Sequence, residues 1–203
     1  VVRLSLNIIN KKKLIKKIIS TIKKVILMEI NEAAAMLKND YINAAKKMIW
    51  ADLGCGNGTF TLALAAMLSP GSLVYAIDTN AASLQQIPSG YKQVSIEKHK
   101  ADFITDELPF ANIDGILMAN ALHYVQSKNA FLKKVAAHLK EDGSFLIVEY
   151  NTDEPVPVWV PFPVSFTTLR DLFLNAGFST IQQLDERPSV YGHASMYSAF
   201  VTG

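Results

Sequence analysis

From residue 28 onward, short apolar runs alternate with stretches in which apolar residues recur at helical spacing. Short apolar runs bounded by glycine or proline predict buried strands, here at Met48–Leu53, Ser72–Asp78, Gln93–His99, Ile113–Ala119 and Ser144–Tyr150. Helices are expected before and between them, at Asn31–Lys47, Thr59–Leu68, Asn80–Gln86 and Asn129–Leu139. The breaks are expected at Pro70-Gly71, Ser89-Gly90 and Asp142-Gly143. Alternating strands and helices predict a doubly wound α/β fold with a parallel sheet.

The pattern changes after Tyr150. Four prolines predict a stiff, non-helical connection, namely Pro155, Pro157, Pro161 and Pro163. A helix at Thr167–Ala176 should then end at Gly177, and two last apolar runs, Phe178–Leu184 and Ala194–Val201, predict an antiparallel hairpin. The sequence therefore predicts a seven-stranded, mostly parallel sheet with a C-terminal antiparallel hairpin, in one domain over residues 28–203.

The composition is that of an ordinary globular domain, with 50% apolar and 19% charged residues among 203. The net charge of +2 is unevenly distributed, because eight of the 20 basic residues and no acidic residue lie in residues 1–28. The rest holds 12 basic and 18 acidic residues, a net charge of −6. An acidic body argues against a nucleic-acid-binding surface. No apolar run approaches the roughly 18 residues of a membrane span, so no integral membrane segment is expected.

Residues 1–27 form a basic N-terminal extension that leaves three interpretations open. Its apolar residues recur at helical spacing between lysines, which suits an amphipathic helix resting on an anionic membrane or on RNA. It could instead be a helix packed on the domain. It could also be foreign to the fold, since the chain begins with Val1 and the composition changes at Met28. The last two are favoured, and the lysines that interrupt every apolar stretch disfavour a secretory signal.

A glycine-rich loop, Asp52-Leu53-Gly54-Cys55-Gly56-Asn57-Gly58, joins the first predicted strand to a predicted helix. Glycines let a backbone turn sharply and approach a ligand closely, and the helix N-terminus adds free N–H groups and partial positive charge. The third glycine comes one residue earlier than in a dinucleotide site. Asp52 would repel a pyrophosphate but suits an ammonium or a sulfonium. The loop therefore favours S-adenosylmethionine over a nicotinamide cofactor.

Cys55, the only cysteine, excludes an internal disulfide and is compatible with a reducing cytosol. We expect it to fill a tight corner of the loop rather than to react, because free cysteine mostly behaves as a small hydrophobe. The expected location is cytoplasmic.

From about Trp50 to Tyr150 the chain resembles the class I S-adenosylmethionine-dependent methyltransferases, particularly the small-molecule branch that includes quinone-biosynthesis methylases. The resemblance implies a Rossmann-like methyltransferase fold with S-adenosylmethionine as cofactor. The glycine loop is similar to the first motif of the family, in which the acid and the backbone hold the amino-acid end of the cofactor. The residues that this assigns are Asp52, Gly54, Gly56 and Gly58.

The resemblance continues over the next three strands. Ala76-Ile77-Asp78-Thr79 is similar to the second motif, in which the acid binds both ribose hydroxyls. Asp102 and Phe103 resemble the segment around the adenine, where the acid accepts from the exocyclic amine and the aromatic residue forms a wall. Residues 113–125 resemble the fourth strand and the loop that faces the transferable methyl group, which assigns Asn120 to cofactor binding.

Each candidate also has a structural interpretation: turns and helix caps for the aspartates, and the core for Phe103 and His123. The joint position of the candidates favours a site, because Asp52, Asp78, Asp102 and Asn120 lie at the carboxyl ends of four successive predicted strands, where open α/β sheets bind ligands. No metal site is predicted.

The predicted activity is methyl transfer to a small-molecule acceptor by in-line displacement, in which the protein aligns the acceptor and excludes water. His123 is the candidate catalytic base, although such a base is optional, and Tyr124 should shape the acceptor pocket. The acceptor is expected under the helix at Asn31–Lys47 and the segment Trp159–Pro163. The acceptor itself and the oligomeric state are left open.

The same residues bear on several other functions. A non-catalytic S-adenosylmethionine-binding partner or sensor would share the fold, but the complete set of cofactor residues weighs against it. An adenosine or nicotinamide enzyme of other chemistry is disfavoured by Asp52. Tyr124 and Lys128 have the spacing of a short-chain dehydrogenase pair, but the serine upstream and the dehydrogenase glycine spacing are missing. No Asn/Asp-Pro-Pro-Tyr/Phe motif follows the fourth strand, which disfavours amino methylation of nucleic-acid bases.

Overall fold

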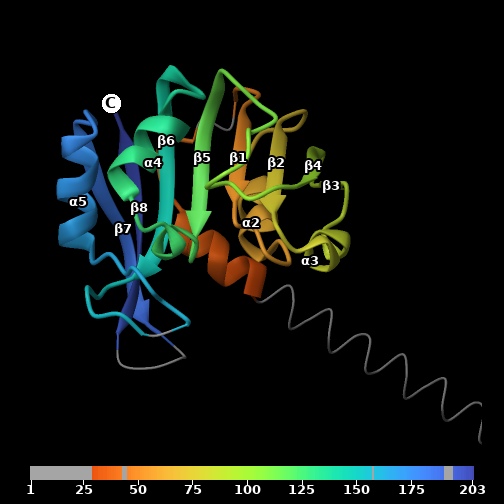
Figure 1. Cartoon of the computed structure of the whole chain (residues 1–203). Helices are drawn as coiled ribbons and strands as arrows, with labels where there is room; N and C mark the ends of the chain where they lie inside the picture. Colours follow the sequence, from red (N-terminus) through yellow and green to blue (C-terminus); the bar gives the residue numbers. More distant parts are fainter. Residues whose placement is uncertain (1–28, 43–44, 157, 190–193) are drawn as a thin grey trace, which may run out of the picture.

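The computed structural model describes residues 29–42, 45–156, 158–189 and 194–203. These residues form one eight-stranded sheet in the order β3-β4-β2-β1-β5-β6-β8-β7 (Figure 1). The strands are β1 (Ile49–Leu53), β2 (Leu73–Asp78), β3 (Gly90–Tyr91), β4 (Val94–Lys100), β5 (Ile113–Ala119), β6 (Leu139–Tyr150), β7 (Thr180–Pro188) and β8 (Ser195–Thr202).

The central strands are parallel, and the C-terminal strands are antiparallel. β1 pairs in parallel with β2 and β5, β2 pairs in parallel with β4, and β5 pairs in parallel with β6. β8 is antiparallel to both β6 and β7. The predicted doubly wound, mostly parallel sheet with a C-terminal antiparallel hairpin is therefore confirmed.

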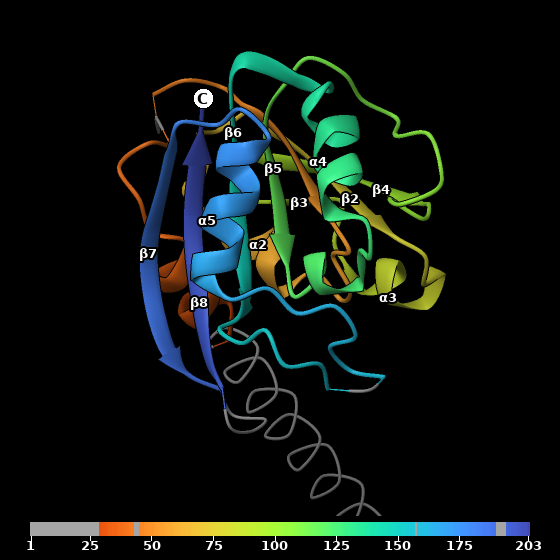
Figure 2. The same ribbon diagram turned by 60° about the vertical axis from the view of Figure 1, so that its left-hand side comes forward.

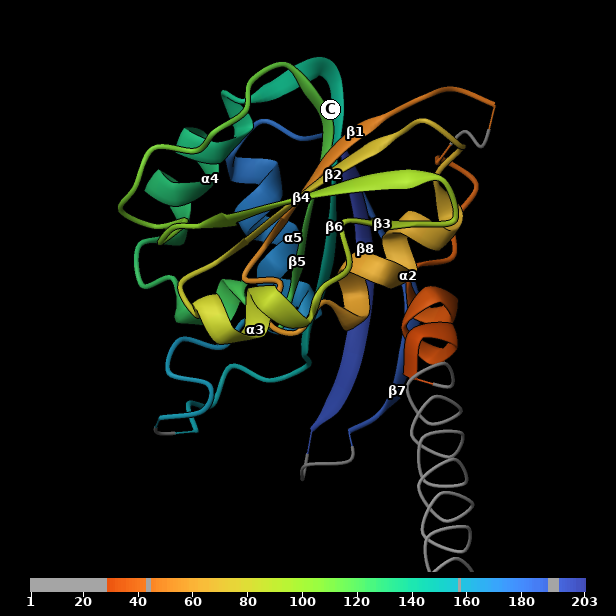
Figure 3. The ribbon, with the colours of Figure 1, turned by 90° about the vertical axis from the view of Figure 1, so that its right-hand side faces the viewer.

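Helices cover both faces of the sheet. The helical residues 29–37, α2 (Thr59–Met67) and α3 (Ala81–Gln86) bury apolar side chains in one core. α4 (Lys128–Ala136) and α5 (Phe166–Asn175) do so in a second core on the other face, where Figure 2 shows them in front of the sheet. Figure 3, which looks along the sheet from the β3–β4 edge, shows α4 and α5 on one side and α2 on the other. Trp50 of β1 packs in the first core and Ala51 in the second, as alternation along a strand requires.

The sheet has eight strands rather than the predicted seven, because of β3. This two-residue strand lies antiparallel to β4, with Tyr91 opposite Val94. The two residues between them, Lys92 and Gln93, have φ angles of 47° and 65°. Two central residues with positive φ make a hairpin turn whose twist matches the strands, and this one lacks the Asn-Gly signature that would have predicted it.

The predicted helix at Asn31–Lys47 is wrong in its second half. Helical backbone ends at residue 37, and residues 38–42 and 45–48 are irregular. The side chain of Asn39 donates to the carbonyl of Leu37 at 2.8 Å and accepts from the N–H groups of Tyr41 and Ile42 at 2.9 Å each. Asparagine thus offers the backbone an alternative to further helical hydrogen bonds, and the helix stops.

The predicted break at Asp142-Gly143 is also wrong. β6 begins at Leu139 and runs through these residues. The register shifts instead: Ile113 pairs with Leu139, whereas Gly115 pairs with Ser144. A bulge in β6 takes up the extra residues, so the chain stays in the sheet.

The basic extension at residues 1–27 lies outside the described residues, so the interpretations given for it and the domain boundary at residue 28 stay predictions. Among the helices that the structure describes, none has the length and apolar character needed to cross a membrane.

Candidate functional site

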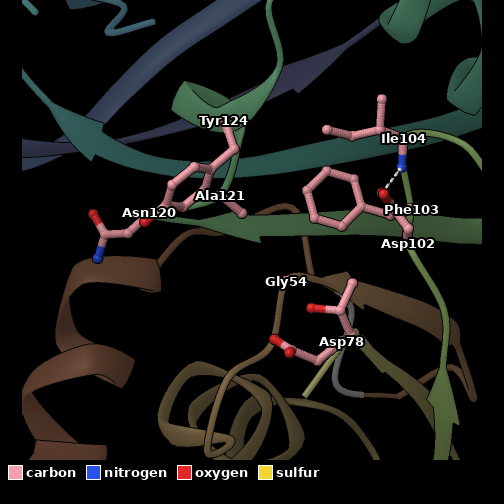
Figure 4. A pocket seen from close by; sticks show the side chains of 9 residues that line it. Gly54, Asp78, Asp102, Phe103, Ile104, Asn120, Ala121 and Tyr124 are labelled. Atoms are coloured by element: carbon pink, nitrogen blue, oxygen red, sulfur yellow. Dashed lines mark hydrogen bonds between the residues drawn. The ribbon is translucent and has the colours of Figure 1, made fainter. Parts of the chain in front are cut away.

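A cavity of about 350 Å³ lies where β1, β2, β4 and β5 end at their carboxyl edge (Figure 4). Six of the predicted site residues line it, together with three neighbours that the cofactor prediction did not include. The predicted six are Gly54, Asp78, Thr79, Asp102, Phe103 and Asn120, and the three neighbours are Ile104, Ala121 and Tyr124. Asp52, Gly56, Gly58 and His123 are not part of the lining.

The glycine loop is held to β2 and passes very close to the loop after β5. The N–H groups of Gly54 and Cys55 both donate to the carbonyl of Ile77, at 2.9 and 3.0 Å. A Cβ added to Gly54 would lie 2.7 Å from the Cβ of Ala121, and φ at Gly54 is +78°. Close approach and a positive φ both require glycine here.

Gly56 has a different environment. Its φ is +53°, but an added Cβ would meet no atom within 4 Å. The open space beside Gly56, the central glycine of the loop, leaves room for a ligand close to the backbone, whereas Gly54 is enclosed by protein.

Asp78 ties this loop to the start of α3. Its carboxylate accepts the N–H of Gly56 at 2.8 Å and the N–H of Asn80 at 2.7 Å. The helix-capping role that was an alternative for Asp78 belongs to Asn80, whose side chain accepts from Ala82 and Ser83. Asp78 lines the cavity, and each of its oxygens keeps a lone pair for a ligand hydroxyl.

Asp52 is fully buried rather than exposed at the mouth of the strand. One carboxylate oxygen accepts the hydroxyl of Thr61 at 2.6 Å, and the other, Oδ1, has no partner among the described residues. Burial raises the pKa of Asp52 from 3.8 to about 7; the hydroxyl of Thr61 opposes this, and the nearby Asp78 adds to it. A buried carboxyl group with a free oxygen suits a cationic partner.

Asp102 and Phe103 form the wall next to β4. The carboxylate of Asp102 accepts the N–H of Ile104 at 2.9 Å, as Figure 4 shows, and its own N–H donates to Asp106 at 2.9 Å. Phe103 is 8% exposed and lies edge-on to Phe131, with ring centroids 5.8 Å apart. Phe103 is therefore both a core residue and part of the cavity wall, so the two interpretations given for it are compatible.

Asn120 follows β5 with a φ of 53°. Its N–H donates to the carbonyl of Val148 at 2.8 Å, and its side-chain Oδ1 is buried without a partner in the described part of the chain. Asn120 lines the cavity and thus brings a buried acceptor without a described partner to it, whereas the unpaired oxygen of Asp52 lies outside the lining.

His123 lies behind the cavity wall. It is 3% exposed, its Nδ1 lies 2.7 Å from Oε2 of Glu149, and its backbone N–H donates to Oε1 of Glu149 at 3.1 Å. Tyr124, from the same 3-10 turn η1 (Leu122–Tyr124), lines the cavity instead, with its ring centroid 4.3 Å from that of His123. Glu149 is a residue of this site that the sequence did not predict, and its position near the end of the apolar run of β6 was the only local signal for it.

The charged residues that line the cavity are Asp78 and Asp102. Two carboxylates, with the buried Asp52 nearby, suit a ligand that carries hydroxyls, an amine and positive charge. They oppose a ligand that carries several phosphates.

Residues 51–143 match a family model described as a methyltransferase domain. An uncharacterised methyltransferase of Mycobacterium tuberculosis is 28% identical over 101 residues, which are 50% of this chain and 50% of the relative. The chain thus spans about half the length of the curated relatives it matches.

Solved structures share the fold. The YcgJ protein of Bacillus subtilis aligns with a TM-score of 0.63 at 15% identity, over 85% of this chain and 98% of that one. Human N-acetylserotonin methyltransferase, solved in complex with S-adenosylmethionine, aligns with a TM-score of 0.59 at 20% identity, over 76% of this chain and 47% of that one. The predicted Rossmann-like methyltransferase fold is confirmed, and the matched domain supports S-adenosylmethionine as the cofactor.

Proposed function

We propose, on the basis of the methyltransferase domain at residues 51–143, that this chain transfers the methyl group of S-adenosylmethionine to a small-molecule acceptor by in-line displacement. The observation that carries the proposal is the buried Oδ1 of Asn120, which has no partner among the described residues, in a cavity that Asp78 and Asp102 also line. A buried acceptor costs about 1–3 kcal/mol when it is unpaired, so this oxygen beside two carboxylates indicates a ligand with hydrogen-bond donors.

The predicted residues suit the parts of the cofactor, and six of them line the cavity. Asn120 would hold the amino-acid end, where the ammonium supplies the missing donor, and Asp52, buried outside the lining, would favour that ammonium through its charge. Asp78 would accept from the ribose hydroxyls, and the open space at Gly56 would let the loop lie close to the ligand. Asp102 would accept from the adenine amine, and Phe103 would cover the ring. Thr79 and Gly58 complete the assigned set.

The chemistry requires positioning above all. When bound, S-adenosylmethionine supplies a methyl carbon that its sulfonium activates toward displacement. The chain has to align the acceptor, exclude water and remove a proton where the acceptor's pKa demands it. Tyr124 is the cavity residue on the side where an acceptor would enter.

His123 stays the predicted base. The bond to Glu149 favours a tautomer with hydrogen on Nδ1, which leaves Nε2 as the proton acceptor. The ring lies behind Tyr124, so His123 reaches an acceptor only if this turn shifts.

A small-molecule acceptor of the quinone-biosynthesis type is the finer part of this proposal. The carboxylate-lined cavity and the net charge of −6 outside residues 1–28 support it over a nucleic acid. The cytoplasm is the proposed location, on the single cysteine.

Calorimetric titration with S-adenosylmethionine, S-adenosylhomocysteine and NADH tests the proposal, on wild type, Asp78→Ala and the control Asp142→Ala. Asp142 is an exposed aspartate of β6 outside the cavity lining. Both adenosyl compounds should bind, and Asp78→Ala should weaken them about ten- to a hundredfold, because hydrogen bonds to a charged group contribute about 1.5–3 kcal/mol. The control should bind as wild type does.

Binding of NADH alone would refute the proposal. Binding of the adenosyl compounds with no methyl transferred to any of a broad set of small acceptors would favour the non-catalytic binding protein.

A further inference from the structure

The segment between β6 and α5 exposes large apolar side chains to solvent. Trp159 is 74% exposed and Val158 86% exposed. A tryptophan normally contributes a large area to a core or an interface. Neighbouring exposed apolar side chains therefore indicate that something covers them.

Hydrogen bonds near both ends of this segment hold it to the rest of the domain. Val164 is buried, and its carbonyl accepts the hydroxyl of the buried Tyr197 at 2.9 Å. On the other side, Asp153 accepts from the N–H of Ser165 at 2.9 Å and from its hydroxyl at 2.7 Å. Val156 and Val160 form a bridge, and the N–H of Trp159 donates to the carbonyl of Val156 at 3.2 Å, so the backbone of Trp159 is held beside this bridge.

The segment is joined to the wall of the cavity. The N–H of Phe162 donates to the carbonyl of His123 at 3.0 Å, directly before Tyr124. Lys128 donates to the carbonyls of Phe162 and Val125, at 2.6 and 2.8 Å, and its ammonium lies 5.9 Å from the Phe162 ring centroid. Figure 2 shows the segment at the edge of the sheet where β5 and β6 end.

The charged side chains in these contacts form hydrogen bonds within the protein. Asp153 is bonded to Ser165 and Thr168, and Lys128 is bonded to two carbonyls. Apart from these bonded charges and the exposed Glu154, the segment offers a ligand aliphatic and aromatic side chains, namely Val158, Trp159 and Phe162.

We propose that Tyr124, Phe162 and Trp159 form the acceptor site, and that the acceptor is an uncharged aromatic molecule. Tyr124 would contact the ring next to the cofactor cavity, and Trp159 would cover its outer side. This inference rests on the proposed function, and it adds the chemical class of the acceptor and the surface that selects it.

Titration of 2-naphthol in the presence of S-adenosylhomocysteine tests it, with 2-naphthalenesulfonate as the charged analogue of the same ring system. Wild type should bind the naphthol at least tenfold more tightly than the sulfonate. Trp159→Ala should weaken naphthol binding about tenfold or more, since covering a tryptophan face removes much apolar surface from water, and Trp159→Phe should recover part of it.

Leu174→Ala is the matched control, because Leu174 is an apolar residue of α5, 43% exposed and outside the cavity lining. It should bind 2-naphthol as wild type does. Titration of every variant with S-adenosylhomocysteine alone separates the two proposals. If wild type does not bind S-adenosylhomocysteine, the proposed function is refuted.

With S-adenosylhomocysteine bound, three results would overturn the acceptor inference. They are an absence of naphthol binding, equal affinity in wild type and Trp159→Ala, or Trp159-dependent sedimentation with phosphatidylcholine vesicles in place of naphthol binding. The last result would assign the exposed tip to a lipid surface.

Discussion

Replacing Asp52 with asparagine should make the ligand-free protein more stable than wild type at alkaline pH, although the change removes a charge at the proposed cofactor site. Asp52 is fully buried, with one oxygen on Thr61 and the other without a partner among the described residues. Burial, opposed by Thr61 and assisted by Asp78, raises the pKa of Asp52 to about 7. Ionisation therefore stabilises the unfolded chain more than the folded one.

The sign and the size follow from proton linkage. Between its ordinary pKa of 3.8 and a folded value of about 7, the folded state binds the proton more tightly, so the free energy of unfolding falls as pH rises. Each pH unit in that window costs about 1.4 kcal/mol, which gives at most about 4 kcal/mol in all. From about pH 5.5 to about pH 8.5, the loss from this one group is about 2 kcal/mol.

Urea unfolding of ligand-free protein, followed by tryptophan fluorescence at these two pH values, measures the effect. Wild type should lose about 2 kcal/mol more than Asp52→Asn over this range. Asp114→Asn is the control: burial by itself raises the pKa of Asp114, but hydrogen bonds from Lys140 and the N–H of Ile49, with the charges of Lys140 and Lys46, lower it overall. Its stabilising contribution is lost only under acid conditions, so its curve should run parallel to that of wild type.

Equal pH dependence in wild type and Asp52→Asn would refute the reasoning. Saturating S-adenosylmethionine should flatten the wild-type dependence, because a nearby ammonium favours the ionised carboxylate.

Five further substitutions probe the glycine loop and the pair formed by His123 and Glu149. Gly54→Ala places a Cβ 2.7 Å from that of Ala121 and should lower the free energy of unfolding by about 2–4 kcal/mol, measured by thermal melting. Gly56→Ala meets open space, so it should cost only about 1–2 kcal/mol of stability while weakening cofactor binding. Equal losses of stability in the two variants would contradict this prediction. Glu149→Ala leaves two donors of His123 without their partner and should lower the free energy of urea unfolding by about 2–5 kcal/mol. Glu149→Gln should lower it less. An equal loss in both variants would argue against a hydrogen-bonding role of Glu149. If His123 is the base, His123→Gln should lower kcat and leave S-adenosylhomocysteine binding unchanged, and an unchanged kcat would exclude it.

The elements that could be predicted carry their signal locally. Apolar runs lie within β1, β2, β5, β6 and β8, and Gly177 marks the end of α5 with a φ of 98°. β3 carried no such signal, because its turn residues Lys92 and Gln93 adopt positive φ without being glycine. The length of the first helix depended on a side chain, Asn39, that bonds the backbone around it.

The candidate site likewise has features that the sequence predicted and features that it did not. Strand order and direction bring Asp78, Asp102 and Asn120 to one edge, and the sequence was sufficient to predict this. It did not predict the pairing of His123 with Glu149, which lies on a neighbouring element 26 residues away.

The sequence by itself determined the α/β fold, the glycine loop and the edge of the sheet where the cavity lies, because periodicity and glycine spacing are properties of the chain. Only the tertiary structure decided which atoms face the cavity. It buried Asp52, left its Oδ1 without a partner in the described part of the chain, and put Tyr124 in the wall with His123 behind it. Burial and hydrogen-bond partners depend on packing between distant segments, and therefore on the folded molecule as a whole.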